Sequence, residues 1–340
     1  MAVIPVDNKE YWEKRQLKKY LSGEKQIIDY YKDLRRSFEQ SKREIQSAIN
    51  DFYWRYAEDN QVTYAAAQLR LSKTDLGTLQ SFIDKVNKSM GKYDLEVNNL
   101  SIKSRLTRYE ALQIEIDAIL QNLYAVEYEY KGIDKLKDVY SESYYRTWFN
   151  IDQYNGYHLN FAQINAKAVE ELIKYPFDGA DFSTRLWKQK DFMLQQLSES
   201  ITTMLVQGRN PKTLAPDFAK KFKTREYEAY RLLQTEASYI IEQASQDMYV
   251  EDEVKQYQWI ATLDRKTCEL CQALDNKIFK VGEGVPGKTL TPRHPLCRCT
   301  TIPYYEEPDE EDTRAARNSK GKIYKVPASM SYEQWKKEYV

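Results

Sequence analysis

Apolar residues recur at helical spacing through much of the chain. Between residues 24 and 58 they lie three, four or seven positions apart, which keeps them on one stripe of a helix. The members of this stripe are Ile27, Tyr31, Leu34, Phe38, Ile45, Ile49, Phe52 and Tyr56. Charged residues fill most of the positions between them. The run is longer than the roughly 11–12 residues of an average helix, so it predicts a helical bundle or a long antiparallel helix pair.

The same periodicity predicts more helices further along the chain. Residues 63–86 and 101–130 carry apolar side chains at helical spacing. A loop around Tyr175 precedes a helix that runs toward Val206, and another helix is expected from about residue 224 to residue 248. Up to this point we expect the chain to be nearly all α-helical.

The pattern changes near residue 255. Tyr257–Leu263 and Lys277–Val281 are rich in β-branched and aromatic residues and predict two strands, while the glycines between residues 282 and 287 predict a hairpin connection. The expected fold class is therefore mainly α, with long N-terminal helices, a helical middle and a small β-rich module near the C-terminus.

The last part of the chain has a different character again. Six of the seven residues from 306 to 312 are acidic, which predicts a solvated linker. Residues 331–340 predict a short amphipathic helix with Trp335 and Tyr339 on one face, which either binds a partner or folds back on the body of the protein. The expected domains are a long-helix domain over residues 1–140, a helical domain over 141–254, the β-rich module over 255–306, and the acidic linker with its terminal helix over 307–340.

Composition supports a helical protein and narrows its function. Only 11 of the 340 residues are glycine, and 28 tyrosines supply amphipathic side chains for helix faces and partner contacts. The 51 basic and 51 acidic residues cancel, which argues against a protein that coats DNA. No apolar run approaches the ~18–20 residues of a membrane span. The first ten residues are too polar for a secretory signal, so we expect synthesis in the cytoplasm.

One cluster carries candidate chemistry. All four cysteines lie between residues 268 and 299, together with His294, one of two histidines in the chain. Cys268 and Cys271 form a C-x2-C turn, and Cys297 and Cys299 would face one side of an extended segment. Four such donors suit tetrahedral Zn²⁺, which would cross-link a small loop-rich segment. The preferred structural zinc ligands are Cys268, Cys271, Cys297 and Cys299, with His294 as the substitute.

Other chemistries use the same residue types. In an oxidising extracellular particle the cysteines would form disulfides. A catalytic Cys–His pair is disfavoured because the sequence places no orienting acid beside it. A hydrolytic zinc site is disfavoured because it uses three His, Asp or Glu ligands and an open position. The sequence contains no HExxH, Walker or nucleophile-elbow motif, so we expect no enzymatic activity.

The segments around the cysteines are distinctive. Residues 259–275 read W-I-A-T-L-D-R-K-T-C-E-L-C-Q-A-L-D, residues 294–299 read H-P-L-C-R-C, and residues 233–236 read L-Q-T-E. Together they resemble the signature of the Mu F-like head morphogenesis proteins, which are minor capsid proteins of tailed phages. The resemblance extends over roughly residues 170–340. The chain departs from the family pattern at Gln234, Lys266 and Asn276.

This resemblance implies a minor head component of a tailed phage or prophage, made in the cytoplasm of a bacterial host. Such proteins associate with the portal protein during procapsid assembly, and a scaffold or major capsid protein is a further expected partner. The implied location is inside the virion head, near the portal, and some such proteins pass into the host with the DNA. The zinc module would then act as a rigid docking or folding unit.

The alternative function is a zinc-containing nucleic-acid-binding protein in weak contact with phage DNA. It rests on the basic residues around the cysteines, which are Lys277, Lys280, Lys288, Arg293 and Arg298. The zero net charge of the chain argues against it.

Overall fold

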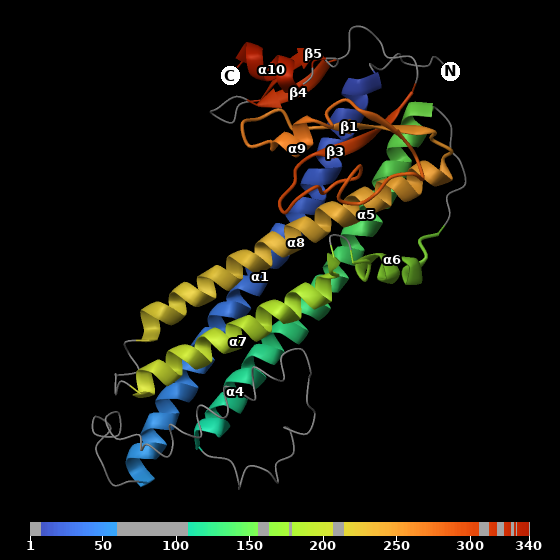
Figure 1. Cartoon of the computed structure of the whole chain (residues 1–340). Coiled ribbons are helices and arrows are strands. Elements are labelled where there is room, and N and C mark those ends of the chain that lie inside the picture. Colours follow the sequence, from blue (N-terminus) through green and yellow to red (C-terminus); the bar gives the residue numbers. More distant parts are fainter. Residues whose placement is uncertain are drawn as a thin grey trace. The chain divides into compact units, whose positions relative to one another are not determined.

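Figure 1 shows the computed structural model of the chain. The residues that it describes are 8–59, 108–155, 163–176, 179–206, 214–305, 313–317, 323–327, 330 and 332–339. The helical segment predicted over residues 63–86, the first part of the segment over 101–130 and the acidic block at 306–312 lie outside the described residues, as does the side chain of Tyr339.

The mainly α fold is confirmed. The helices are α1 (Asn8–Asp59), α4 (Arg108–Asn122), the π-helix η3 (Leu123–Tyr130), α5 (Lys131–Asn155), α6 (Ala166–Ile173), α7 (Phe182–Val206), α8 (Ala215–Glu251), α9 (Glu269–Gln272) and α10 (Tyr332–Tyr339). Two of them begin earlier than their apolar stripes indicate. Helix α1 begins at Asn8, before the predicted stripe, and Tyr11 and Trp12 are buried in this added part. In α8, Pro216 lies in the first turn. Backbone N–H groups in the first turn have no acceptor within the helix, so the N–H that proline lacks is not needed there.

The chain forms two compact units. The first comprises Met1–Tyr30, Ile133–Phe182 and Arg231–Val340, and the second comprises Tyr31–Gly132 and Ser183–Tyr230. Helices α1 and α8 contribute residues to both units. The four-part division along the sequence stays a prediction. None of the described helices has both the length and the apolar character needed to cross a lipid bilayer.

The second unit is a helical assembly with a continuous apolar core. Its fully buried side chains include Leu34, Phe38, Ile45, Leu112, Ile116, Leu120, Tyr124, Leu186, Met193, Leu197, Phe218 and Phe222. The rings of Phe38 and Tyr124 meet edge to face with their centroids 5.9 Å apart, a favoured arrangement for aromatic pairs. Leu34, Phe38 and Ile45 of the predicted α1 stripe thus pack in this core, while Ile27 is buried in the first unit.

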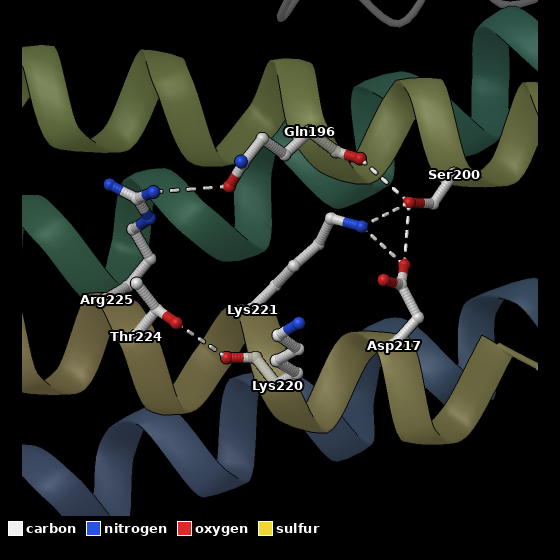
Figure 2. Close-up of polar contacts among 7 residues, drawn as sticks. All are labelled: Gln196, Ser200, Asp217, Lys220, Lys221, Thr224 and Arg225. Atoms are coloured by element: carbon white, nitrogen blue, oxygen red, sulfur yellow. Dashed lines mark hydrogen bonds and ion pairs between the residues drawn. The ribbon is translucent and has the colours of Figure 1, made fainter.

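Polar side chains join α7 to the first turns of α8 within the second unit (Figure 2). The hydroxyl of Ser200 donates to Asp217 Oδ2 at 2.8 Å, and the ammonium of Lys221 donates to Ser200 at 2.6 Å and also pairs with Asp217. Further along, Arg225 Nη2 donates to Gln196 Oε1 at 3.3 Å. Because these contacts link successive turns of both helices, they fix the register of α7 on α8.

In the first unit, α1 packs closely against α5 and α8. Gly23 of α1 makes this possible, because a Cβ atom there would lie 2.7 Å from Ile241 Cδ1. Lys19, one turn before it, is buried, and its ammonium donates to Thr147 Oγ1 at 3.0 Å and to Ser245 Oγ at 2.6 Å. A charged side chain is therefore enclosed among the three helices and satisfied by hydroxyl groups.

A small antiparallel sheet follows α8, with the strand order β2-β1-β3. The strands are β1 (Gln256–Ile260), β2 (Ile278–Lys280) and β3 (Thr300–Tyr304). Tyr257 in the centre lies opposite Phe279 on one side and Pro303 on the other. Figure 1 shows β1 and β3 beside the C-terminal part of α8. The two predicted strands are present, and β3 is an addition to the prediction.

The C-terminal residues form a second small structure. Strands β4 (Thr313–Arg317) and β5 (Ile323–Pro327) pair as an antiparallel hairpin, and α10 follows. Trp335 of α10 is buried in a cluster with Leu263, Ala316 and Val326, and its indole N–H donates to the Tyr324 hydroxyl at 2.6 Å. Of the two predicted roles for this helix, the structure shows the one in which it folds back.

Candidate metal centre

The first pair of cysteines is brought together by the short helix α9. Cys268 is its N-cap residue, and its carbonyl accepts hydrogen bonds from the N–H groups of Cys271 at 3.1 Å and Gln272 at 3.0 Å. Residues three positions apart lie on one face of a helical turn. The C-x2-C spacing therefore places the thiols of Cys268 and Cys271 on the same side.

The other three donors lie on the segment that leads into β3. The N–H of Cys297 donates to the carbonyl of His294 at 3.1 Å, which closes a tight turn. Leu296 inside this turn has a φ of 60°, a left-handed conformation that is uncommon for a residue with a side chain. Cys299 follows directly before β3. All five predicted donors are thus gathered in one place, from two turns that are separated by β2 and the glycine-containing loop after it. This loop is not the predicted hairpin connection, because β2 and β3 lie on opposite sides of β1 and do not pair with each other.

The donor spacing suits a tetrahedral ion of the size of zinc. Cys271 Sγ lies 3.8 Å from Cys297 Sγ and 3.5 Å from His294 Nε2. With Zn–S bonds of about 2.3 Å and Zn–N bonds of about 2.05 Å, a tetrahedron has S···S edges of about 3.8 Å and S···N edges of about 3.5 Å. Donor atoms within 4.8 Å of one another form two triplets, Cys268–Cys271–His294 and Cys271–Cys297–Cys299. Cys271 belongs to both.

Burial and redox state favour a structural site. Cys271, Cys297 and Cys299 are buried in a small cluster with Trp259 and Ala261, and all four cysteines are free thiols. The 3.8 Å between the sulfurs of Cys271 and Cys297 is well beyond the roughly 2.05 Å of a disulfide bond. Thiol-rich and enclosed donor sets are typical of structural metal sites rather than hydrolytic ones.

The protonation of the cluster is uneven. Hydrogen bonds from the Cys271 and Cys299 thiols hold the pKa of Cys297 well below its usual value. Because the Cys271 thiol donates its proton to the Cys297 thiolate, the pKa of Cys271 is raised. The hydrogen bond to Cys297 raises the pKa of His294 to about 9. One thiolate is therefore stabilised by donors around it. A metal ion would replace the protons of these donors, so its binding releases protons.

The rest of the distinctive segment holds the two turns together. The carboxylate of Asp264 pairs with the guanidinium of Arg298, which lies between two candidate ligands. Asp275 Oδ1 accepts a hydrogen bond from the N–H of Ala261 at 2.9 Å, which ends β1. Thr262 Oγ1 donates to the carbonyl of Arg298 at 2.7 Å. These residues explain why the sequence pattern extends beyond the cysteines.

Helix α8 supports the same segment, and sequence reasoning missed it. Thr235 Oγ1 accepts a hydrogen bond from the N–H of Leu296 at 3.2 Å, and Ser238 lies 3.5 Å from the carbonyl of Cys297. The buried carboxylate of Glu242 accepts hydrogen bonds from Thr291 at 2.9 Å and Thr301 at 2.6 Å. The only signal for this role was the Leu-Gln-Thr-Glu resemblance at residues 233–236.

The basic residues proposed for nucleic-acid contact have other partners. Arg298 is paired with Asp264, and Arg293 donates to the carbonyl of Lys288. Lys280 lies 3.8 Å from the carboxylate of Glu283. Three of the five basic groups therefore make contacts within the chain itself, which weakens the nucleic-acid alternative.

Comparisons with known proteins agree with the sequence pattern. Residues 195–302 match the family model described as Phage Mu protein F like protein, a range that includes α8, β1, β2, the start of β3 and all five donors. The chain is 25% identical over 299 residues to the Minor head protein GP7 of Bacillus phage SPP1. This alignment covers 82% of this chain and 94% of GP7.

A second relative has a different name. The chain is 28% identical over 275 residues to the NAD(+)–arginine ADP-ribosyltransferase EFV of Enterococcus faecalis (strain ATCC 700802 / V583). That alignment covers 75% of this chain but only 54% of the relative, so the chain spans about half of its length. No solved structure matches the chain.

Proposed function

We propose that this chain, which is Mu F-like over residues 195–302, is a minor head protein of a tailed phage and takes part in head morphogenesis. The observation that carries the proposal is the alignment with the minor head protein GP7, which extends over nearly the whole of that protein. The matched family segment also contains the metal centre together with the part of α8 that supports it. Similarity and structure thus point to the same part of the chain.

We assign this protein a structural role and no catalytic one. His294 contacts both Cys271 and Cys297, and both of these thiols are buried. A catalytic cysteine needs an accessible thiolate. The Nδ1 atom of His294 contacts the carbonyl of Pro295, at 2.9 Å, rather than a carboxylate. The transferase activity in the name of the second relative is not assigned to this chain.

The proposed partner is the portal protein, with a scaffold or major capsid protein as a further one, and the proposed location is the inside of the head near the portal. The test is co-production of the tagged chain with the portal protein of the same phage or prophage, followed by affinity purification. We expect the portal protein to co-purify in a fixed ratio and to cross-link to this chain. Recovery of the chain with nucleic acid but without any head protein would contradict the proposed role.

We also propose that the cluster binds one structural Zn²⁺. Cys268, Cys271, Cys297 and Cys299 are the preferred ligands, with His294 as the substitute. The donor types, their spacing and their burial support this assignment. A bound zinc ion would cross-link the α9 turn to the segment before β3.

Single substitutions will identify the ligands. Because Cys271 belongs to both triplets, Cys271→Ser should abolish zinc binding measured by elemental analysis. Cys268→Ser, Cys299→Ser and His294→Gln each leave four candidate donors, and the variant that keeps one zinc per chain with unchanged affinity marks the donor that is not a ligand. His158→Gln, which changes the other histidine, is the matched control.

A further inference from the structure

The hydroxyl group of Thr235 on α8 accepts a hydrogen bond from the ligand-bearing turn. Thr235 donates its only hydroxyl proton to the carbonyl of Arg231 at 2.6 Å. Its oxygen therefore presents lone pairs to the N–H of Leu296, which donates to it at 3.2 Å. Thr235 is buried, with 4% of its surface exposed, so water does not compete freely for these bonds. The contact joins positions that are 61 residues apart.

The conformation of Leu296 makes this contact important. A left-handed backbone costs a residue with a side chain roughly 1–2 kcal/mol, which glycine would avoid. Leu296 lies between His294 and Cys297, and its turn lets both of these donors approach Cys271. A leucine holds this conformation only where its surroundings impose it. The Thr235 hydroxyl is the group that accepts its N–H.

Two more residues on the same face of α8 hold the segment on either side of Leu296. Ser238 is three positions after Thr235 and lies 3.5 Å from the carbonyl of Cys297. Glu242 is four positions further and accepts from threonines on both sides of the ligand-bearing turn. This spacing places the three side chains along one face of the helix. The face organises the segment through side chains that do not themselves belong to the donor set.

We infer that Thr235 is a positioning residue for the metal centre. By holding Leu296 in its left-handed conformation, the Thr235 hydroxyl presents His294 and Cys297 to Cys271 before a metal ion arrives. The inference rests on the proposed zinc site. Groups that orient metal ligands typically change metal affinity by about 10–100-fold when removed, although they never touch the ion.

The test compares three variants of the full chain. Thr235→Val keeps the shape of the side chain but removes the hydroxyl, and Thr235→Ser restores it. Thr224→Val is the matched control, because Thr224 lies on the same helix and makes the same bond to a carbonyl four residues back, but is exposed. The first readout is the rate at which zinc passes to a colorimetric chelator. The second is the thiolate-to-metal absorption of the cobalt-substituted protein.

We expect Thr235→Val to bind zinc about 10–100-fold more weakly, which faster release to the chelator will report, and to show an altered cobalt spectrum. Thr235→Ser and Thr224→Val should stay within about twofold of the wild type. If the wild type binds zinc and Thr235→Val releases it at the wild-type rate, the inference is wrong and the zinc site stands. If the wild type binds no zinc, both fail.

The control variant and the folding of Thr235→Val also bear on the inference. Faster release from Thr224→Val as well would mean a general effect on the helix and would overturn the inference. Should Thr235→Val not fold, Thr235→Ala replaces it, and amide exchange of the peptide containing Leu296 is compared among the metal-free Thr235→Ala, Thr235→Ser and wild-type proteins. Loss of protection in Thr235→Ala but not in Thr235→Ser supports the role of the hydroxyl. Equal protection in all three contradicts it.

Discussion

Arg298 and Asp264 form an ion pair that ties the ligand segment to the loop before Cys268, with Arg298 Nη2 2.8 Å from Asp264 Oδ1. Asp264 is 7% exposed, and removing one partner of such a pair leaves the other charge poorly solvated. We predict that Asp264→Asn lowers the free energy of unfolding of the first unit by about 2 kcal/mol. Denaturant titration measures this. Asp33→Asn, which breaks an exposed pair with Arg36, should cost under about 0.5 kcal/mol.

The same pair has a pH signature. Burial opposes ionisation of Asp264, but the hydrogen bonds from Arg298 outweigh it and hold the pKa of this carboxyl below its usual range. Its stabilising contribution is therefore present above about pH 4 and is lost as the pH falls through the lowered pKa. Wild type should lose stability below pH 4 more steeply than Asp264→Asn. Parallel pH profiles for the two proteins would argue against the pair as a source of stability.

Charged Lys19 destabilises the folded state, whereas ionised Asp264 stabilises it. Burial lowers its pKa to about 7, with partial compensation from the charge of Glu242. Between pH 7 and pH 10.5 the unfolded chain binds a proton that the folded chain does not, so stability rises with pH across this range. We predict that Lys19→Met is more stable than wild type at pH 6, by on the order of 3 kcal/mol, and that the gain shrinks toward pH 10.

Thermal unfolding at several pH values tests the Lys19 prediction. The control is Lys18→Met, an exposed neighbour on α1, which should shift stability by a constant small amount at every pH. A Lys19→Met protein that is less stable than wild type at pH 6 would mean that the hydrogen bonds to Thr147 and Ser245 outweigh the cost of burying the charge.

Trp335 should control the attachment of the C-terminal segment. Its indole is 1% exposed and fills the small cluster of α10 with the β4–β5 hairpin. Truncating a buried tryptophan costs about 3–5 kcal/mol of folding free energy, which we expect to unfold a cluster of this size. We predict that Trp335→Ala makes residues 313–339 sensitive to limited proteolysis while the sheet and the cysteines stay protected. Trp54→Ala, which changes a tryptophan that is 61% exposed, should not alter the digestion pattern.

Metal removal should act locally. The apolar cluster around the cysteines contains few residues, so the two ligand-bearing turns depend on the ion for their cross-link. We predict that a chelator, or the Cys271→Ser substitution, increases amide exchange across residues 256–305 and leaves residues 183–206 and 214–230 of the second unit unchanged. Unaltered exchange in the first range after complete zinc removal would show that the module folds without metal.

Local patterns were sufficient to predict much of this protein. The stripe from Ile27 to Tyr56 predicts a helix because each of its members needs only neighbours three or four residues away. The five donors were predicted together because each of the two turns is encoded within a few residues. The spacing did not identify which of them bind a metal, and that assignment stays a prediction.

Long-range contacts were not predictable in this way. Strand β3 contains Pro303, which argues against a strand unless it lies at a sheet edge, and its edge position depends on the pairing with β1. The short hairpin of β4 and β5 includes Thr-Arg-Ala-Ala-Arg, which has little β propensity. The bond from Leu296 to Thr235 joins two residues 61 positions apart, and no spacing rule connects them.

A minor head protein is present in DNA-filled phage heads. Quantitative mass spectrometry of such heads, purified from the phage or induced prophage that encodes this chain, tests whether the chain is there. We predict that the chain is present in every preparation at a small, constant ratio to the major capsid protein and that it survives nuclease and protease treatment of intact heads. Heads that contain DNA and the portal protein but none of this chain would contradict the proposal.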